Sequence, residues 1–246
     1  MKHGFLTLIA VLFVILGHGQ QKLAYFTSFP CISPDGNQVV FTYEGDLWKV
    51  SIDGGLATRL TAMLGEETRA KFSPDGNWIA FTGSQYGNQD IFVLPADGGE
   101  VRQLTFHEAF DHIDNWSWDS KEIYFTSSRE NRNSAYTVSA TGGTPKRLFH
   151  NFFHTVHNIV VHPDGDIFFS ETSESKSQAY RKGYKGSYNP EIQSYNPKTK
   201  AFLKYTKYEG KDMWPTIDRQ GKVYFVSDEK NGQYNLSTLN RNKAVH

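Results

Sequence analysis

The sequence lacks several features that would point directly to a class of protein. It has a single cysteine, Cys31, so no internal disulfide can form and the fold must be stabilised by packing. Its 26 basic and 26 acidic side chains are balanced and form no long run of one sign, so no nucleic-acid partner is predicted. Beyond residues 5–17 it has no long apolar run, so no membrane span is predicted there.

Residues 1–19 have the order of a secretory signal peptide. Lys2 supplies a positive charge, residues 5–17 form an apolar core of 13 residues, and Gly17 and Gly19 place small residues before a cleavage point near Gln20. The alternative is a membrane anchor, but 13 residues are short of the ~20 that a spanning helix needs. The segment therefore predicts a secreted or periplasmic protein.

One repeated unit organises the rest of the chain, and residues 72–105 show it best. Residues 74–76, Pro-Asp-Gly, are typical of a tight turn. The alternation that follows places Ile79 and Phe81 on one face of a strand and Ala80 on the other. A second β-rich run, an Asp-Gly-Gly turn and a short strand ending in Arg-Gln-Leu-Thr complete the unit. Together with the strand that enters the first turn, the unit has four strands.

Copies of this unit follow one another at the spacing of propeller blades. The residues that open the first turns, Ser33, Ser73, Ser117 and His162, are 40, 44 and 45 residues apart. Four-stranded blades repeat every 40 to 50 residues or so, roughly the spacing seen here. The sequence therefore predicts an all-β fold, a β-propeller of four-stranded antiparallel blades with about five blades visible. The expected blades are residues 27–61, 66–105, 110–149, 155–206 and 212–246.

The fifth blade is predicted to be incomplete. Its third strand should end near Leu239, a turn follows, and only residues 244–246 remain for a fourth strand. The flank of this blade, including some of Val223, Phe225 and Tyr234, would then lack a neighbour, and an unpaired strand edge recruits other chains. We therefore expect residues 20–246 alone to form a homo-oligomer or to be prone to aggregation.

The fourth repeat carries an insertion. The distance from Asp164 to Asp218 grows to 54 residues, and residues 180–188 are basic and aromatic. Arg181 and Tyr184 could overhang one mouth of the channel and contact an extended ligand, or the segment could be a solvated loop between strands. The residue types alone favour the solvated loop.

No catalytic residue, metal site or cofactor is predicted. Residues 83–87 do not form the Gly-x-Ser-x-Gly elbow, since the serine is one place early and no strand-to-helix turn surrounds it. The Ser-x-x-Lys at residues 173–176 lies in a loop, where the two side chains do not share a helical face, so chance explains it better. His107 and His112 are five apart, whereas metalloprotease histidines are four apart on a helix. Hydrogen bonds to loop carbonyls are the favoured role of the histidines.

The recurring pattern of Ser-Pro-Asp-Gly, apolar alternation, Asp-Leu-Trp or Asp-Ile-Phe, Asp-Gly-Gly and Arg-Leu-Thr resembles the propeller repeats of tricorn protease and its bacterial relatives. TolB and the prolyl-oligopeptidase-type enzymes carry related repeats. Residues 43–48 resemble the opening blade of the tricorn family, and residues 180–186 resemble its tyrosine- and arginine-rich insertion. The resemblance, over residues 26 to about 240, implies a six-bladed N-terminal propeller that precedes a serine-peptidase core. No catalytic residue of that core can be carried over to this sequence.

Two functions follow from these observations. The resemblance implies the N-terminal propeller of a tricorn-like peptidase, which admits peptides or unfolded polypeptide to a catalytic core in C-terminal domains absent from this sequence. The alternative is a TolB-like periplasmic scaffold that binds proteins without catalysis. In both cases the ligand is expected at the channel rim, where connections between blades converge. The candidate rim residues are Arg69, His107, His112, Asp114, His154, His157, Arg181, Tyr184 and Trp214.

Overall fold

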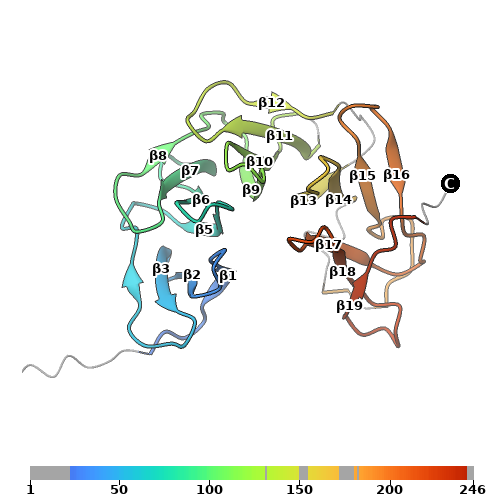
Figure 1. The fold of residues 1–246 in the computed structure, drawn as a ribbon, viewed down its shortest axis with the longest axis horizontal. Coiled ribbons are helices and arrows are strands. Elements are labelled where there is room, and N and C mark those ends of the chain that lie inside the picture. Colours follow the sequence, from blue (N-terminus) through green and yellow to red (C-terminus); the bar gives the residue numbers. More distant parts are fainter. Residues whose placement is uncertain (1–22, 131, 150–154, 172–179, 182, 243–246) are drawn as a thin grey trace, which may run out of the picture.

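The computed structural model describes residues 23–130, 132–149, 155–171, 180, 181 and 183–242. The predicted signal peptide lies outside these ranges. Within them all regular structure is β-strand, arranged as five antiparallel sheets around a central axis (Figure 1). The predicted β-propeller is therefore confirmed. Within the same ranges, no helix is long and apolar enough to cross a membrane.

Each sheet is one blade, and its strands follow one another in sequence from the axis outwards. The first blade comprises β1 (Ser28–Ile32), β2 (Gln38–Tyr43), β3 (Asp46–Ser51) and β4 (Thr58–Arg59), and the second comprises β5 (Glu67–Phe72), β6 (Trp78–Gly83), β7 (Asp90–Pro95) and β8 (Arg102–Gln103). The third comprises β9 (Asp111–Trp116), β10 (Glu122–Ser127), β11 (Ser134–Ser139) and β12 (Lys146–Arg147). The fourth comprises β13 (Val156–Val161), β14 (Ile167–Glu171), β15 (Ile192–Tyr195) and β16 (Phe202–Lys204). The fifth comprises β17 (Asp212–Ile217), β18 (Val223–Ser227) and β19 (Asn235–Thr238).

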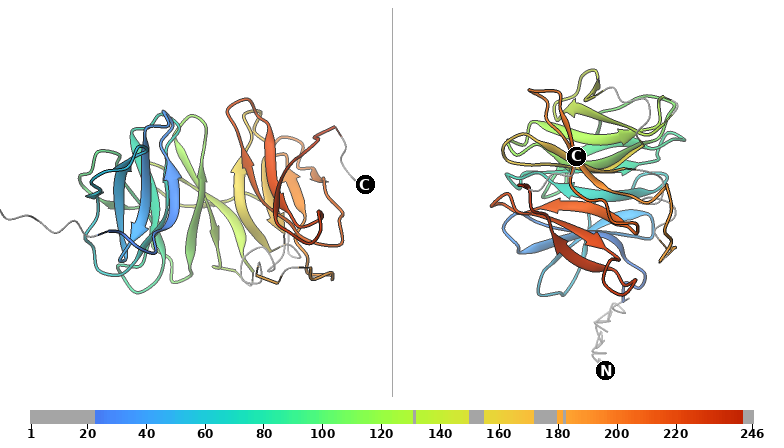
Figure 2. Two further views of the ribbon diagram at one scale, coloured as in Figure 1. Left: turned by 90° about the horizontal axis from the view of Figure 1, so that it is seen from below. Right: turned by 90° about the vertical axis from the view of Figure 1, so that its right-hand side faces the viewer.

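The fifth blade has three strands in the described part of the chain, as its sequence predicts. Figure 1 shows an open sector between this blade and the first, while the other neighbouring blades stand side by side. Figure 2 shows that the strands of all five sheets run between the two faces of the disc. The innermost strands β1, β5, β9, β13 and β17 therefore surround a central channel.

The core lies between neighbouring blades, and strand alternation decides which side chain meets which blade. Ile79 and Phe81 are fully buried in one cluster with Val40 of the first blade. Ala80, on the opposite face of the same strand, is buried in a second cluster with Ile113 of the third blade. The predicted division of these side chains between two faces is correct, and it explains why both faces of a central blade are apolar.

Two of the three residues predicted on the exposed flank of the fifth blade, Val223 and Phe225, are buried instead, whereas Tyr234 is partly exposed. Val223 and Phe225 are 1% and 8% exposed, because they face the fourth blade and pack with its Phe168. Val226, which alternates with them, is only partly buried, and its cross-strand partner Leu236 is 70% exposed. Period-two alternation separates the two faces of a strand, but it does not say which face meets the neighbouring blade.

The Asp-Leu-Trp and Arg-Leu-Thr motifs of the repeat meet in space. In the second blade, the Thr105 hydroxyl accepts a hydrogen bond from the amide of Ile91 (2.9 Å) and donates one to an Asp90 oxygen (3.1 Å). The hydroxyls of Thr61 and Thr206, at the equivalent positions in the first and fourth blades, each accept a hydrogen bond from a backbone N–H and donate one to a carboxylate oxygen. A single threonine hydroxyl therefore provides a hydrogen-bond partner for both a strand amide and a carboxylate.

We expect Thr105→Val to destabilise the protein by about 1 to 3 kcal/mol, because it leaves the Ile91 amide and the buried Asp90 carboxylate without this partner. Thr105→Ser, which keeps the hydroxyl, is the matched control and should lose about 1 kcal/mol or less. Urea unfolding followed by tryptophan fluorescence measures both variants. Equal losses would mean that the methyl group, and not the hydroxyl, stabilises the motif.

The turns between the first and second strands of each blade lie together on one face of the disc, which we call the turn face. Hydrogen bonds join these turns between blades. The Asp75 amide of the second blade donates to the Ser120 hydroxyl of the third (3.1 Å), and the Trp118 indole of the third blade donates to the Val161 carbonyl of the fourth (2.6 Å). His162 Nε2 of the fourth blade is hydrogen-bonded to the Gly221 carbonyl of the fifth (2.9 Å). The Arg219 guanidinium of the fifth blade donates to the Pro34 carbonyl of the first. The last of these bridges the open sector between the fifth and first blades.

Candidate functional site: the central channel

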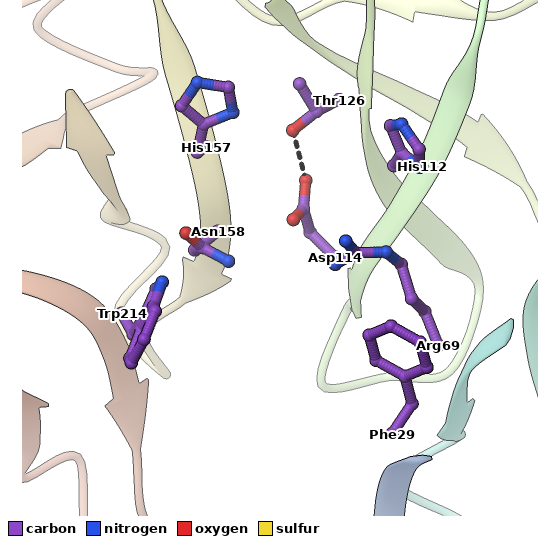
Figure 3. Close-up of a pocket in the computed structure, with 8 residues that line it drawn as sticks. All are labelled: Phe29, Arg69, His112, Asp114, Thr126, His157, Asn158 and Trp214. Atoms are coloured by element: carbon purple, nitrogen blue, oxygen red, sulfur yellow. Dashed lines mark hydrogen bonds between the residues drawn. The ribbon is translucent and has the colours of Figure 1, made fainter. Parts of the chain in front are cut away.

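The innermost strand of every blade contains a β-bulge, which adds one residue to that strand relative to its partner. In four of the five blades the bulge residue has a positive φ although it is not glycine. These residues are Phe29 (φ 50°), Arg69 (58°), Asn158 (55°) and Trp214 (57°). Such conformations are uncommon and cost on the order of 1 to 3 kcal/mol each, so the rest of the structure must hold them. The bulge directs all four side chains to the channel (Figure 3).

The third blade departs from this pattern. Its bulge has no positive φ, and the residue in register with Arg69 is Ile113, which is buried in the core. The next residue, Asp114, faces the channel in its place, and its carboxylate accepts a hydrogen bond from the Thr126 hydroxyl (Figure 3). The third blade therefore contributes an acidic group to the channel wall.

Two overlapping cavities fill the channel between the inner strands. One has a volume of about 350 Å³ and the other about 490 Å³. They share the five side chains just described, so these line a continuous space. The first cavity is also lined by His112, Thr126 and His157, and the second also by Lys71, Asn115, Pro215, Thr216 and Ile217.

Arg69 is the most distinctive group in the channel. Its guanidinium carbon lies 5.0 Å from the centre of the Phe29 ring, so the cation is stacked on an aromatic face. Burial raises the pKa of Asp114 to about 6, while the Thr126 hydrogen bond and the positive charge of Arg69 act in the opposite direction. The acid of the channel is therefore only partly ionised near pH 6.

The facing wall carries an amide and an indole. Asn158 Oδ1 is buried and has no hydrogen-bond partner among the described residues. The Trp214 side chain is 38% exposed, and its ring centre lies 6.3 Å from that of Tyr234. This arrangement can bind a ligand by charge, hydrogen bonds and ring contact. No group of three metal-ligating side chains that could hold an ion occurs in the described ranges.

The structure brings together five of the candidate rim residues and separates the others. Arg69, His112, Asp114, His157 and Trp214 line the 350 Å³ cavity. His107 instead lines a separate pocket beside Tyr86 and Phe106, on the connection between the second and third blades. Arg181 stacks on Tyr184, with 3.9 Å between its guanidinium carbon and the ring centre, and neither side chain lines the two channel cavities. His154 lies outside the described residues.

Sequence reasoning missed Phe29, Thr126 and Asn158. A positional signal for two of them was present, because Phe29 and Asn158 each stand four residues before the residue that opens the blade's first turn. Arg69 and Trp214 have the same offset. Aligning the repeats at this position would have identified four of the five bulge side chains.

The whole described fold matches a known protein family. A model of the tricorn protease N-terminal β-propeller domain matches residues 24–245. The chain belongs to this family. Tricorn protease homolog 1 of Streptomyces coelicolor is 34% identical to this tricorn-type propeller over 80 residues, which are 32% of this chain and 7% of that protein. A TolB homolog of Chlorobium luteolum is 36% identical over 55 residues, 22% of this chain and 13% of that protein. The matched stretches therefore span well under two thirds of either relative.

Solved structures show the same fold. The putative TolB from Agrobacterium tumefaciens superposes with a TM-score of 0.69 and 21% identity, covering 86% of this chain and 79% of that one. Tricorn protease superposes with a TM-score of 0.69 and 20% identity, covering 88% of this chain and 21% of that one. At these identities the likeness concerns only the architecture of the tricorn-type propeller.

Proposed function

We propose that this tricorn-type propeller binds peptides in its central channel and positions them for a peptidase core elsewhere in the parent protein. The observation that supports this most is the ring of bulge side chains around one continuous cavity. A concave site with rings and a few placed polar groups suits a peptide, which offers apolar side chains, amides and terminal charges at once. Residues 1–19 and the TolB relatives support a location outside the cytoplasm.

A TolB-like scaffold is the second candidate, and one observation favours it. The superposition with this chain covers 79% of the putative TolB structure but only 21% of tricorn protease, so the propeller makes up most of the former and a small part of the latter. A scaffold would bind a folded partner over the surface of the disc, where truncating one channel side chain changes little. A peptide-binding channel would depend on the side chains that line the cavity.

We expect Trp214→Ala to weaken peptide binding at least tenfold, because aromatic anchors in central pockets carry a large share of binding energy, often about 2 kcal/mol or more. The measurement is fluorescence anisotropy of a labelled random octapeptide pool added to the full chain. Phe106→Ala, which truncates a 77% exposed ring outside the channel cavities, is the matched control. Equal loss in both variants, or no binding by the unaltered chain, would rule out the channel as a peptide site.

A further inference from the structure

A second pocket, which we call the side pocket, lies apart from the channel on the face of the disc opposite the turn face. Its described lining residues fall within 86–90 and 103–108, so its walls are the loop between β6 and β7 and the connection between β8 and β9. It has a volume of about 310 Å³ and shares no described lining residue with the two channel cavities. It is therefore a separate candidate site.

Two exposed aromatic rings line the side pocket, one from each wall. The Tyr86 ring centre lies 6.4 Å from that of Phe92 with 27° between the ring planes, so stacking on the blade holds Tyr86 in place. The Tyr86 side chain is nevertheless 65% exposed, and Phe106 on the other wall is 77% exposed. The face of an aromatic ring is its negative part, so exposed rings in a pocket attract positive charge.

Hydrogen bonds at the base of the side pocket join its two walls. Asn88 Nδ2 donates to the His107 carbonyl (2.7 Å) and to Asp90 Oδ2 (3.2 Å). Gln103 Nε2 donates to the same Asp90 oxygen (3.1 Å), and the Thr105 hydroxyl donates to the other (3.1 Å). The pocket is therefore formed without a ligand, and both oxygens of Asp90 already accept hydrogen bonds.

The charged groups of the side pocket are acidic. Asp90 and Glu108 supply two carboxyl groups, of which that of Glu108 is exposed, and the described lining residues include no lysine or arginine. His107 Nδ1 accepts a hydrogen bond from the Ala109 amide (3.0 Å), so this ring is held as a neutral imidazole and adds no positive charge. Carboxyl groups beside two aromatic rings favour a cation as the ligand.

The hydrogen bonds of the base also indicate which kind of cation fits. A primary ammonium carries three N–H groups, which need acceptors once the ligand leaves water. The oxygens of Asp90 are already engaged by Thr105, Asn88 and Gln103. A quaternary ammonium has no N–H group to satisfy, and its methyl groups pack directly on aromatic rings.

We propose that the side pocket binds a quaternary ammonium group, which contacts the rings of Tyr86 and Phe106 while Glu108 supplies the opposite charge at the rim. This inference is independent of peptide binding in the channel. A trimethylammonium group occurs in free choline and in the headgroup of phosphatidylcholine. Both present the same chemistry to the pocket, so the experiment includes an arm for each.

The test titrates the full chain with three small ligands and follows the ligand signals by NMR. They are choline, dimethylbutanol, in which carbon replaces the charged nitrogen of choline, and ethanolamine, a primary ammonium of the same length. Choline should bind at least about fivefold more tightly than either of the others, because the alcohol lacks the charge and ethanolamine loses hydrogen bonds to water.

Phe106→Leu should weaken choline binding about fivefold and leave dimethylbutanol unchanged, because leucine keeps the apolar bulk and loses the ring. Glu108→Gln should weaken choline binding about threefold, as expected for an exposed charge. Phe110→Leu is the matched control, since it removes a 55% exposed ring on the same connection but outside the side pocket. Melting temperatures verify that all variants fold.

Vesicles distinguish the two sources of the trimethylammonium group. Sedimentation of the chain with phosphatidylcholine vesicles but not with phosphatidylglycerol vesicles, reversed by free choline, would assign the lipid headgroup. Binding of free choline without sedimentation would assign a small solute. Either result supports the proposed ligand class.

Four results would overturn the inference. Choline and dimethylbutanol could bind equally, which would show that charge is not recognised, or ethanolamine could bind as tightly as choline, which would indicate a hydrogen-bonded ammonium. Equal losses in Phe106→Leu and Phe110→Leu would place the ligand elsewhere, and absence of saturable choline binding would remove the site. None of these results bears on peptide binding in the channel, which its own test decides.

Discussion

Arg129→Met should destabilise the protein by about 3 to 5 kcal/mol at pH 8, because it leaves the carboxylate of Asp111 charged and buried without its cation. The two side chains are joined at 2.6 Å, and they are 13% and 0% exposed respectively. Arg129 also donates to Ser127 Oγ at 2.9 Å and stacks over Tyr136 at 4.9 Å. Its removal therefore takes away an ion pair and two neighbouring contacts together.

The pH dependence of this loss identifies its cause. Burial already raises the pKa of Asp111, and the charge of Arg129 opposes that rise. Without Arg129 the pKa should rise further, so the variant can protonate Asp111 at pH 5 and recover part of its stability. Urea unfolding at pH 5 and pH 8 measures the difference.

Two controls accompany Arg129→Met. Lys121→Met breaks an exposed ion pair with Asp119 and should lose about 1 kcal/mol or less. Adding Asp111→Asn to Arg129→Met removes the buried charge and should restore part of the stability at pH 8. A loss that is the same at both pH values, and that Asp111→Asn does not reduce, would assign the effect to packing alone.

Glu67→Gln should stabilise the protein at pH 8 by about 3 kcal/mol, the equivalent of about two and a half pKa units. Glu67 is completely buried, its Oε1 has no hydrogen-bond partner among the described residues, and burial raises its pKa from 4.5 to about 7, with the negative charge of Asp46 adding to the rise. A glutamine keeps the shape and hydrogen-bonding capacity of the protonated acid but cannot ionise.

The sign of the pH dependence follows from the raised pKa of Glu67. The folded protein binds this proton more tightly than the unfolded chain, so the stabilising contribution is fully present below about pH 4.5 and is lost as the pH rises through about 7. The variant should match the unaltered protein near pH 4.5 and exceed it at pH 8. Glu66→Gln, at the exposed neighbouring position, should behave like the unaltered protein at both. A Glu67→Gln variant that is less stable at pH 8 would contradict a buried, protonatable acid.

The architecture could be predicted from the sequence because it is encoded in local chemistry repeated five times. Turn residues such as Pro74 and Gly76 and the alternation of Ile79 with Ala80 act within a few residues, and their spacing fixes the size of a blade. Because the same turns and alternation recur in each repeat, an ambiguous pattern in one copy can be interpreted from the others. The repeated local signal was therefore enough to predict the blades and the order of their strands.

The channel site could be predicted only in part, because a bulge interrupts the alternation from which side-chain direction is read. One added residue in β5 or β13 turns the following side chains to the other face, and the sequence shows no glycine or proline at these bulges. Arg69 was identified by its chemistry, whereas Phe29 and Asn158 resemble ordinary strand residues. Which side chains face the channel is decided by the backbone conformation at the bulges, and the residue types at these positions do not predict that conformation.

The bridge from Arg219 to Pro34 has a consequence for the order of folding. Every strand pairs with the one before or after it in sequence, so each blade can form its backbone ladder as soon as its own residues are available. The bridge joins residues 185 positions apart and can form only when the first and fifth blades are both in place. It therefore forms late among the contacts of the described blades, and interactions formed late mainly govern how slowly the first and fifth blades separate again.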